Sequence, residues 1–185
     1  TLGRVPAMPS GPYAGADYLF SWQGSAKVLL SILKLIEDAL NTDRDIRICP
    51  IGVILMIEDS IKQYSFFLPA LYTLLMKQAF ARVPHGIDEA ERQLHTRTRP
   101  KVVLARTLAE AEALAERYRP FLHGVISDLQ VGAEDAGGAE AGRAFLRRLL
   151  AATPGLPLLL MSADESAAAV ARDLGVAFLD KNSPR

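Results

Sequence analysis

The chain has 185 residues, half of them hydrophobic, and its 21 basic and 21 acidic residues cancel. This size and composition favour about one globular domain with a real core and exclude a disordered tail. The zero net charge argues against binding of nucleic acid or an anionic membrane through bulk charge, and no apolar run approaches the ~18–20 residues of a membrane helix. The single cysteine, Cys49, cannot form an internal disulfide, so we expect a reducing, cytoplasmic setting.

The first fifty residues are expected to form an N-terminal extension, 1–50, that differs from the rest. Residues 1–16 are rich in proline and glycine and predict a loop. Residues 18–20 predict a short strand, and apolar residues spaced three and four apart predict a helix over 26–40. The charged stretch 41–50 predicts a linker.

Strands and helices alternate from residue 51 onward, which predicts a second region, 51–185. The continuous apolar run at 53–57 is typical of a strand buried on both faces of a parallel sheet. Further strands are expected at 101–106, 122–126, 157–161 and 177–179. Helices are expected at 61–81, 87–96, 109–118, 145–150 and 165–174. Five strands in alternation with helices predict a doubly wound α/β fold with a five-stranded parallel sheet.

Polar side chains follow four of the five predicted strands. In chain order these residues are Glu58 and Asp59, Asp128, Ser162, and Lys181. Because the carboxyl ends of parallel strands meet at one edge of the sheet, we expect these groups to lie together there.

Three carboxylates in one place repel each other and need a cation to remain ionised. Carboxylate oxygens without soft donors favour Mg²⁺, and a carboxylate nucleophile beside an ammonium and a hydroxyl suits formation of an aspartyl phosphate. Each residue alone is explained as well by a helix cap, a turn or a solvated charge. It is their joint occurrence on the appropriate strands that points to phosphoryl chemistry.

Four segments resemble the two-component receiver domain of the CheY-like type. They are Ile54–Ser60, Gly124–Asp128, Leu159–Ala163 and Gly175–Lys181. The resemblance covers roughly residues 53–183. It implies a flavodoxin/CheY-like fold and a phosphoprotein of response-regulator phosphorelays, which works by signal transduction rather than as an enzyme.

The resemblance also implies a role for each residue at the strand ends. Asp128 would be the phosphoacceptor, and Asp59 and Asp128 would bind Mg²⁺ with the backbone carbonyl of Gln130. Glu58 would act on the metal through water. Ser162 and Lys181 would contact the phosphoryl oxygens, and Phe178 stands at the position of the family's switch aromatic.

The sequence departs from the family pattern in several places. Asp59 and Asp128 are 69 positions apart, which indicates an insertion near 80–100, and Gly132 stands where the family often has proline. Only four residues follow Lys181, so the last helix is expected to be missing from this chain.

The predicted strand and helix of the extension resemble the end of a preceding receiver. Such a tandem is similar to the front of large bacterial proteins that continue into a phosphoenolpyruvate-synthase-like region. The helix over 26–40 is expected to cover the surface left by the missing last helix, either within one chain or between two copies as a homodimer.

The leading interpretation is a receiver that takes a phosphoryl group onto Asp128 from a histidine kinase or a histidine phosphotransfer protein. It would then change the surface offered to its own downstream output domain, without nucleic acid or a membrane as partner. The alternative is a pseudo-receiver that is not phosphorylated and serves as an interaction or dimerisation module. A phosphatase of the haloacid-dehalogenase type would need a second aspartate two residues after the nucleophile, where this chain has Gln130.

Overall fold

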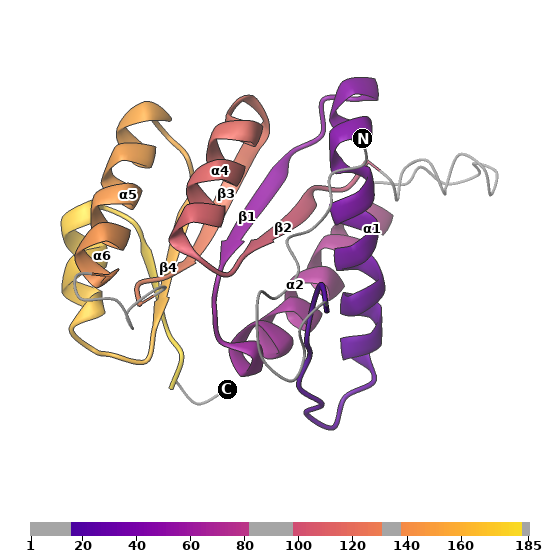
Figure 1. Cartoon of the computed structure of the whole chain (residues 1–185), viewed down its shortest axis with the longest axis horizontal. Coiled ribbons are helices and arrows are strands. Elements are labelled where there is room, and N and C mark those ends of the chain that lie inside the picture. The colour runs from indigo at the N-terminus through magenta and orange to yellow at the C-terminus, as the bar shows by residue number, and fades with distance from the viewer. Residues whose placement is uncertain (1–15, 82–97, 131–137, 183–185) are drawn as a thin grey trace. The chain divides into compact units, whose positions relative to one another are not determined.

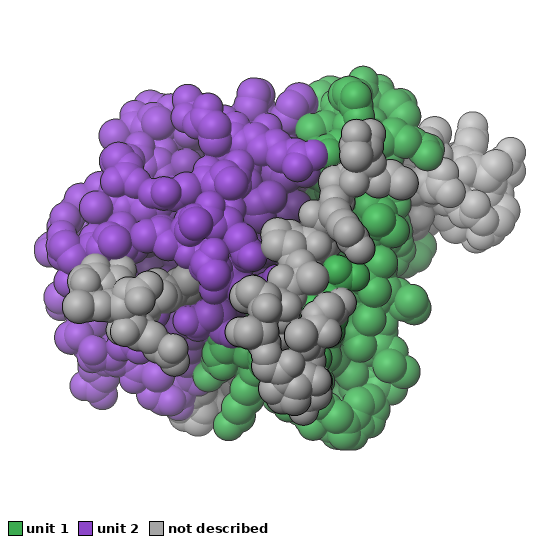
Figure 2. All heavy atoms as spheres, in the orientation of Figure 1, with its two compact units in different colours: residues 1–51, 60–101 green, residues 52–59, 102–185 purple. Residues whose placement is uncertain are grey.

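The computed structural model describes residues 16–81, 98–130 and 138–182. The chain divides into two compact units, the first made of residues 1–51 and 60–101 and the second of residues 52–59 and 102–185 (Figure 2). No helix in the described part of the chain has the length and hydropathy needed to cross a membrane. The predicted helix at 87–96 lies outside the described residues.

A five-stranded sheet organises the second unit (Figure 1). Its strands are β1 (Val53–Ile57), β2 (Lys101–Ala105), β3 (Leu122–Asp128), β4 (Leu158–Ser162) and β5 (Ala177–Asp180). Their order is β2-β1-β3-β4-β5, and β1, β3, β4 and β5 pair in parallel. This is the strand order of the flavodoxin-like doubly wound folds, so the predicted fold class is confirmed.

Strands β1 and β2 are mostly apolar because they are buried on both faces of the sheet. Every residue of β2 is buried, and in β1 successive residues such as Leu55 and Met56 are both fully buried although they point to opposite faces. The register pairs Ile57 with Ser127. Farther along the sheet it pairs Asp128 with Met161 and Ser162 with Asp180. The residues that follow these strands therefore meet at one edge.

Besides the strands, the described part of the second unit contains three helices and a short 3₁₀ turn. They are α4 (Leu108–Tyr118), the 3₁₀ turn Arg119–Phe121, α5 (Gly138–Ala152) and α6 (Ala167–Leu174). The side chain of Thr107 caps α4 by accepting a hydrogen bond from the amide of Glu110. Gly175 ends α6 in the left-handed region at φ 67°, where a side chain would be strained.

The described residues of the first unit form two packed helices, α1 (Lys27–Ile48) and α2 (Ile61–Ala81). The prediction that the first helix stops near residue 40 was wrong, because it continues through most of the predicted linker. Its second half presents Asp38 and Asp45 to buried cations, and Thr42 donates its hydroxyl to the carbonyl of Asp38. These contacts stabilise the helical conformation after residue 40, where the local sequence predicts that the helix ends.

The strand predicted at residues 18–20 is also wrong, since the structure has no strand there. The segment instead lies on α2 and is held by side chains. Tyr64 donates its hydroxyl to the carbonyl of Leu19, and the amide of Ser21 donates to Oγ of Ser65 at 2.9 Å. Side chains of α2 therefore bond backbone groups that a neighbouring strand would otherwise have bonded.

A buried ion cluster joins α1 to the segment that leads into β2. Arg99 forms two bonds to Asp38, with Nη2 2.7 Å from Oδ1 and Nη1 2.9 Å from Oδ2. Tyr72 donates its hydroxyl to the same carboxylate at 3.1 Å, and Nζ of Lys101 lies 2.7 Å from Asp45. Such a network stabilises the unit only while both signs of charge are present.

Candidate functional site

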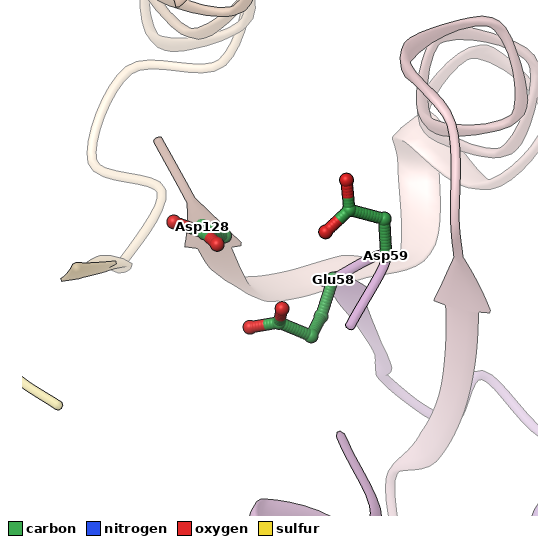
Figure 3. A group of neighbouring side chains, drawn as sticks. All are labelled: Glu58, Asp59 and Asp128. Carbon is green, nitrogen blue, oxygen red and sulfur yellow. The ribbon is translucent and has the colours of Figure 1, made fainter. Parts of the chain in front are cut away.

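Three carboxylates gather at the carboxyl edge of the sheet (Figure 3). Glu58 and Asp59 directly follow β1, and Asp128 is the last residue of β3, which pairs with β1. Glu58, Asp59 and Asp128 each offer an oxygen within 4.8 Å of the others. The structure therefore brings together the three acidic residues that the sequence placed at this edge.

The three acids differ in their contact with solvent. Glu58 is fully buried, Asp128 is partly buried and Asp59 is exposed. The amide of Glu58 donates to the carbonyl of Ala105 at 3.0 Å, which holds the backbone at the end of β1. The cluster thus has one side fixed in the core and one side open to water.

Lys181, the residue that follows β5, provides the positive charge that balances these acids. Its ammonium lies 2.6 Å from Oε2 of Glu58 and 2.8 Å from Oδ2 of Asp128. The side chain is 4% exposed, and the amide of Lys181 donates to the carbonyl of Ser162. Three carboxylates beside one ammonium leave two net negative charges, the balance that a divalent cation neutralises.

Two further residues of the predicted site lie on the strands β4 and β5. Ser162 ends β4 and is buried, and its hydroxyl oxygen accepts a hydrogen bond from the amide of Asp164 at 3.1 Å. Phe178 is half-buried in β5 and pairs with Leu160. Both residues therefore stand on the strands where the sequence put them.

Gln130 contacts the site through its backbone. Its amide donates to Oδ1 of Asp128 at 3.2 Å, while Lys181 donates to Oδ2, so each oxygen of Asp128 has a donor. The Gln130 side chain is exposed. Asp128 is thereby held in one orientation by a neighbour in sequence and by the far end of the chain.

The loop after β4 is braced by a residue that the sequence reasoning did not assign. Asn182 donates its side-chain amide to the carbonyl of Ala163 at 2.9 Å, and its backbone amide donates to Oδ1 of Asp180. In the same loop, the hydrogen bond from the amide of Ser166 lowers the pKa of Asp164. The Asp-Lys-Asn order at the end of β5 is the signal that could have identified this brace, since Asp and Asn side chains commonly bond nearby backbone groups.

The donor set fits a hard divalent cation. All three acidic ligands offer oxygen, none of the site side chains offers sulfur or imidazole nitrogen, and the exposed Asp59 leaves room for water. Asp128 combines a fixed carboxylate with an adjacent ammonium that can neutralise charge on a transferred group. The arrangement can therefore hold a cation and present a carboxylate nucleophile beside it.

Comparison with known proteins gives matches among solved structures alone. No family model matches the chain, and no curated protein matches it. The chain is similar to the chemotaxis protein CheY4 of Vibrio cholerae, with 16% identity, 72% of this chain and 89% of that chain covered, and a TM-score of 0.42. It is also similar to a response regulator of Burkholderia pseudomallei whose structure carries a phosphorylated aspartic acid, a calcium ion and citrate. That match has 18% identity, a TM-score of 0.41 and covers 72% of this chain and 61% of that chain.

Proposed function

We propose that the chain is a receiver-type signalling domain that accepts a phosphoryl group on Asp128. The supporting observation is the ammonium of Lys181 placed between Glu58 and Asp128, at the point where the oxygens of three acids come within 4.8 Å. A cluster of acids on a protein surface does not require a buried ammonium from a strand that is distant in sequence. The strand order of the sheet agrees with this function without requiring it.

The proposed donor is a phosphohistidine of a histidine kinase or a histidine phosphotransfer protein. An oxygen of Asp128 forms the new bond to phosphorus as the nitrogen–phosphorus bond of the donor breaks, and the departing imidazole keeps the electron pair of that bond. Glu58, Asp59 and Asp128 would hold Mg²⁺, which would neutralise part of the phosphoryl charge when bound. Lys181 neutralises a further phosphoryl oxygen.

The signal would pass to an output domain through residues beside the site. A phosphoryl group on Asp128 adds charge next to Ser162, whose hydroxyl can turn from its contact with Asp164 toward that charge. The half-buried Phe178 can then repack on β5. The domain would in this way shift between two surfaces, and it would receive a phosphoryl group instead of turning over a substrate as an enzyme does.

The direct test is phosphorylation of the chain by acetyl phosphate. We expect one added phosphoryl group by intact mass spectrometry, dependent on Mg²⁺ and lost in Asp128→Asn. Asp164→Asn is the matched control, because Asp164 is an exposed acid in a neighbouring loop and its loss should leave the mass gain unchanged. An equal gain in Asp128→Asn would contradict the proposal.

A pseudo-receiver is the second candidate, and one observation favours it. Lys181 already pairs with both Glu58 and Asp128, so the protein itself neutralises part of the cluster. Such a site could persist as a structural element of an interaction module. Calorimetric titration with Mg²⁺ separates the two candidates, because a receiver should bind one ion at the cluster and a pseudo-receiver should bind none.

A phosphatase that forms an aspartyl phosphate is not favoured by the geometry. Such an enzyme needs an acid two residues after the nucleophile, and that position holds Gln130, whose side chain is exposed. Hydrolysis of p-nitrophenyl phosphate at a steady rate by the wild-type chain would reverse this conclusion.

A further inference from the structure

Helix α1 has one buried face of mixed polarity and one exposed apolar face, and the buried face is used inside the first unit. That face packs on α2. Its buried residues are Val28, Ser31, Leu35, Asp38 and Thr42. The spacing of three and four residues places them in one line along the helix.

The second face lies on nearly the opposite side of α1 and is exposed. Leu29, Leu33, Ile36 and Leu40 are 56%, 67%, 42% and 50% exposed. A continuous exposed apolar stripe on a protein surface usually marks an interface. We call these four residues the outer stripe.

The outer stripe has the spacing of a coiled-coil seam. Its residues are separated by four, three and four positions, which is the alternation of a and d positions in a heptad. The seam runs about 18 Å along the helix. Beyond it, the same side of α1 carries the charged residues Asp43 and Arg47. A seam of this kind is complementary to another copy of itself.

We propose that the outer stripe binds the outer stripe of a second copy of this chain, with the two α1 helices antiparallel. A two-fold axis near the middle of the stripe would place Leu33 of one copy opposite Ile36 of the other, and Leu29 opposite Leu40. A two-fold interface of this type uses the same patch on both subunits. This goes beyond the receiver function and does not depend on phosphorylation of Asp128.

The charges along the stripe favour the antiparallel orientation. Lys34 and Glu37 lie on one flank of the stripe and form an ion pair of 2.6 Å within the chain. In an antiparallel pair the two equivalent flanks meet, and an axis between Leu33 and Ile36 places the two copies of Lys34 side by side with one Glu37 on either side of them. In a parallel pair this flank would face the opposite flank, which carries Ile32 and Ala39, and the charges would gain no partner.

The ends of the helices support the same orientation. Arg44 and Arg47 are exposed near the C-terminal end of α1. A parallel pair brings these cations together with those of the second copy, whereas an antiparallel pair separates them to opposite ends and opposes the helix dipoles favourably.

Four central aliphatic side chains with a charged rim have the layout of a protein interface. A stable interface buries about 800 Å² per partner, so this shorter seam predicts a dimer that depends on concentration.

The first experiment measures the mass of the full chain by sedimentation equilibrium over a range of concentrations. We expect a monomer–dimer equilibrium in the wild type. The double variant Leu33→Gln/Ile36→Gln should raise the dimer dissociation constant by more than about tenfold, with unchanged circular dichroism because both side chains are exposed. Leu74→Gln is the matched control, since Leu74 is 52% exposed on α2 and lies off the stripe. A wild type that stays monomeric, or a double variant that dimerises as well as the wild type, would overturn the proposal.

The second experiment tests the orientation by exchanging charges. Lys34→Glu alone would place four acids at the antiparallel interface, and Glu37→Lys alone would place four cations there, so each variant should dimerise less than the wild type. Mixing the two variants should restore association, because one copy then carries two acids and the other two cations. A mixture that associates no better than either variant alone would overturn the antiparallel arrangement.

Discussion

Lys181 is the residue on which the charge balance of the acidic cluster depends. Its ammonium is almost fully buried between Glu58 and Asp128, and breaking a buried ion pair by removing one partner typically lowers the free energy of unfolding by about 3–5 kcal/mol. We expect Lys181→Met to show a loss of this size in urea without metal. Mg²⁺ should restore part of the loss, since the ion neutralises the same carboxylates.

The matched control for this prediction is Lys62→Met, which removes an exposed lysine from α2. Its free energy of unfolding should stay within about 0.5 kcal/mol of the wild type, with no special response to Mg²⁺. If Lys181→Met is equally unstable with and without Mg²⁺, the carboxylates do not form a cation site.

Tyr72 makes the first unit sensitive to alkali. Burial, and then the neighbouring carboxylate of Asp38, raise the pKa of Tyr72 well above its usual value of about 10. The folded state therefore keeps the hydroxyl protonated at a pH where the unfolded chain has already lost that proton. The stability linked to this group is complete below the unfolded pKa and is lost as the pH rises through the folded pKa.

We therefore expect the free energy of unfolding to fall as the pH rises above about 10, with a shallower fall in Tyr72→Phe. Urea unfolding at a series of alkaline pH values measures the slope, and tyrosinate absorbance in the native state shows when the ring ionises. Identical slopes in the two proteins would mean that Tyr72 is not the linked group.

Asp38 is the residue through which helix α1 is fixed to the rest of its unit. Its carboxylate accepts from Arg99 and Tyr72 and lies 3.9 Å from Nζ of Lys101, and all four side chains are buried. We expect Asp38→Asn to lower the free energy of unfolding by about 3–5 kcal/mol, because it removes the carboxylate that pairs with the buried guanidinium of Arg99. Asp43→Asn, on the same helix and partly exposed, should change it much less. Similar losses in the two variants would show that the buried cluster is not what holds α1.

The approach of strand β3 to the start of β1 leaves no space for a side chain at Gly52. A Cβ at this position would lie inside contact distance of the imidazole ring of His123. We expect Gly52→Ala to lower the free energy of unfolding by about 1–3 kcal/mol, the usual penalty for overpacking. In a His123→Ala background the same substitution should have a smaller effect, and thermal melting of the four proteins gives this coupling. If the effects of Gly52→Ala and His123→Ala on stability are additive, the imidazole ring of His123 moves aside freely.

At the scale of the whole molecule, the sheet was predictable because strands such as β1 are apolar on both faces. The continuous apolar run at 53–57 has no helical periodicity, so a buried strand is the structure that it predicts. The acids that follow such a run lie at the edge of the sheet where the strand ends. Glu58, Asp59 and Asp128 could be brought together from topology alone. The contacts of Lys181 with Glu58 and Asp128, and those of Asn182 with the loop after β4, could not be predicted without the side-chain orientations.

The N-terminal part was harder to predict because its structure depends on distant side chains. Asp38 and Arg99 are 61 positions apart, and nothing near residue 41 in the sequence indicates that the helix should continue past it. Residues 18–20 have the composition of a strand, yet side chains of α2 bond their backbone. Local propensity is a weak guide wherever contacts between distant residues decide the outcome.

The order in which the site residues occur along the chain has a consequence for biosynthesis. Translation makes the carboxylates of Glu58, Asp59 and Asp128 long before it reaches Lys181. A growing polypeptide therefore carries the mutually repelling acids without their built-in ammonium until β5 leaves the ribosome. During that interval a cation from the surrounding solution is the available source of compensating charge.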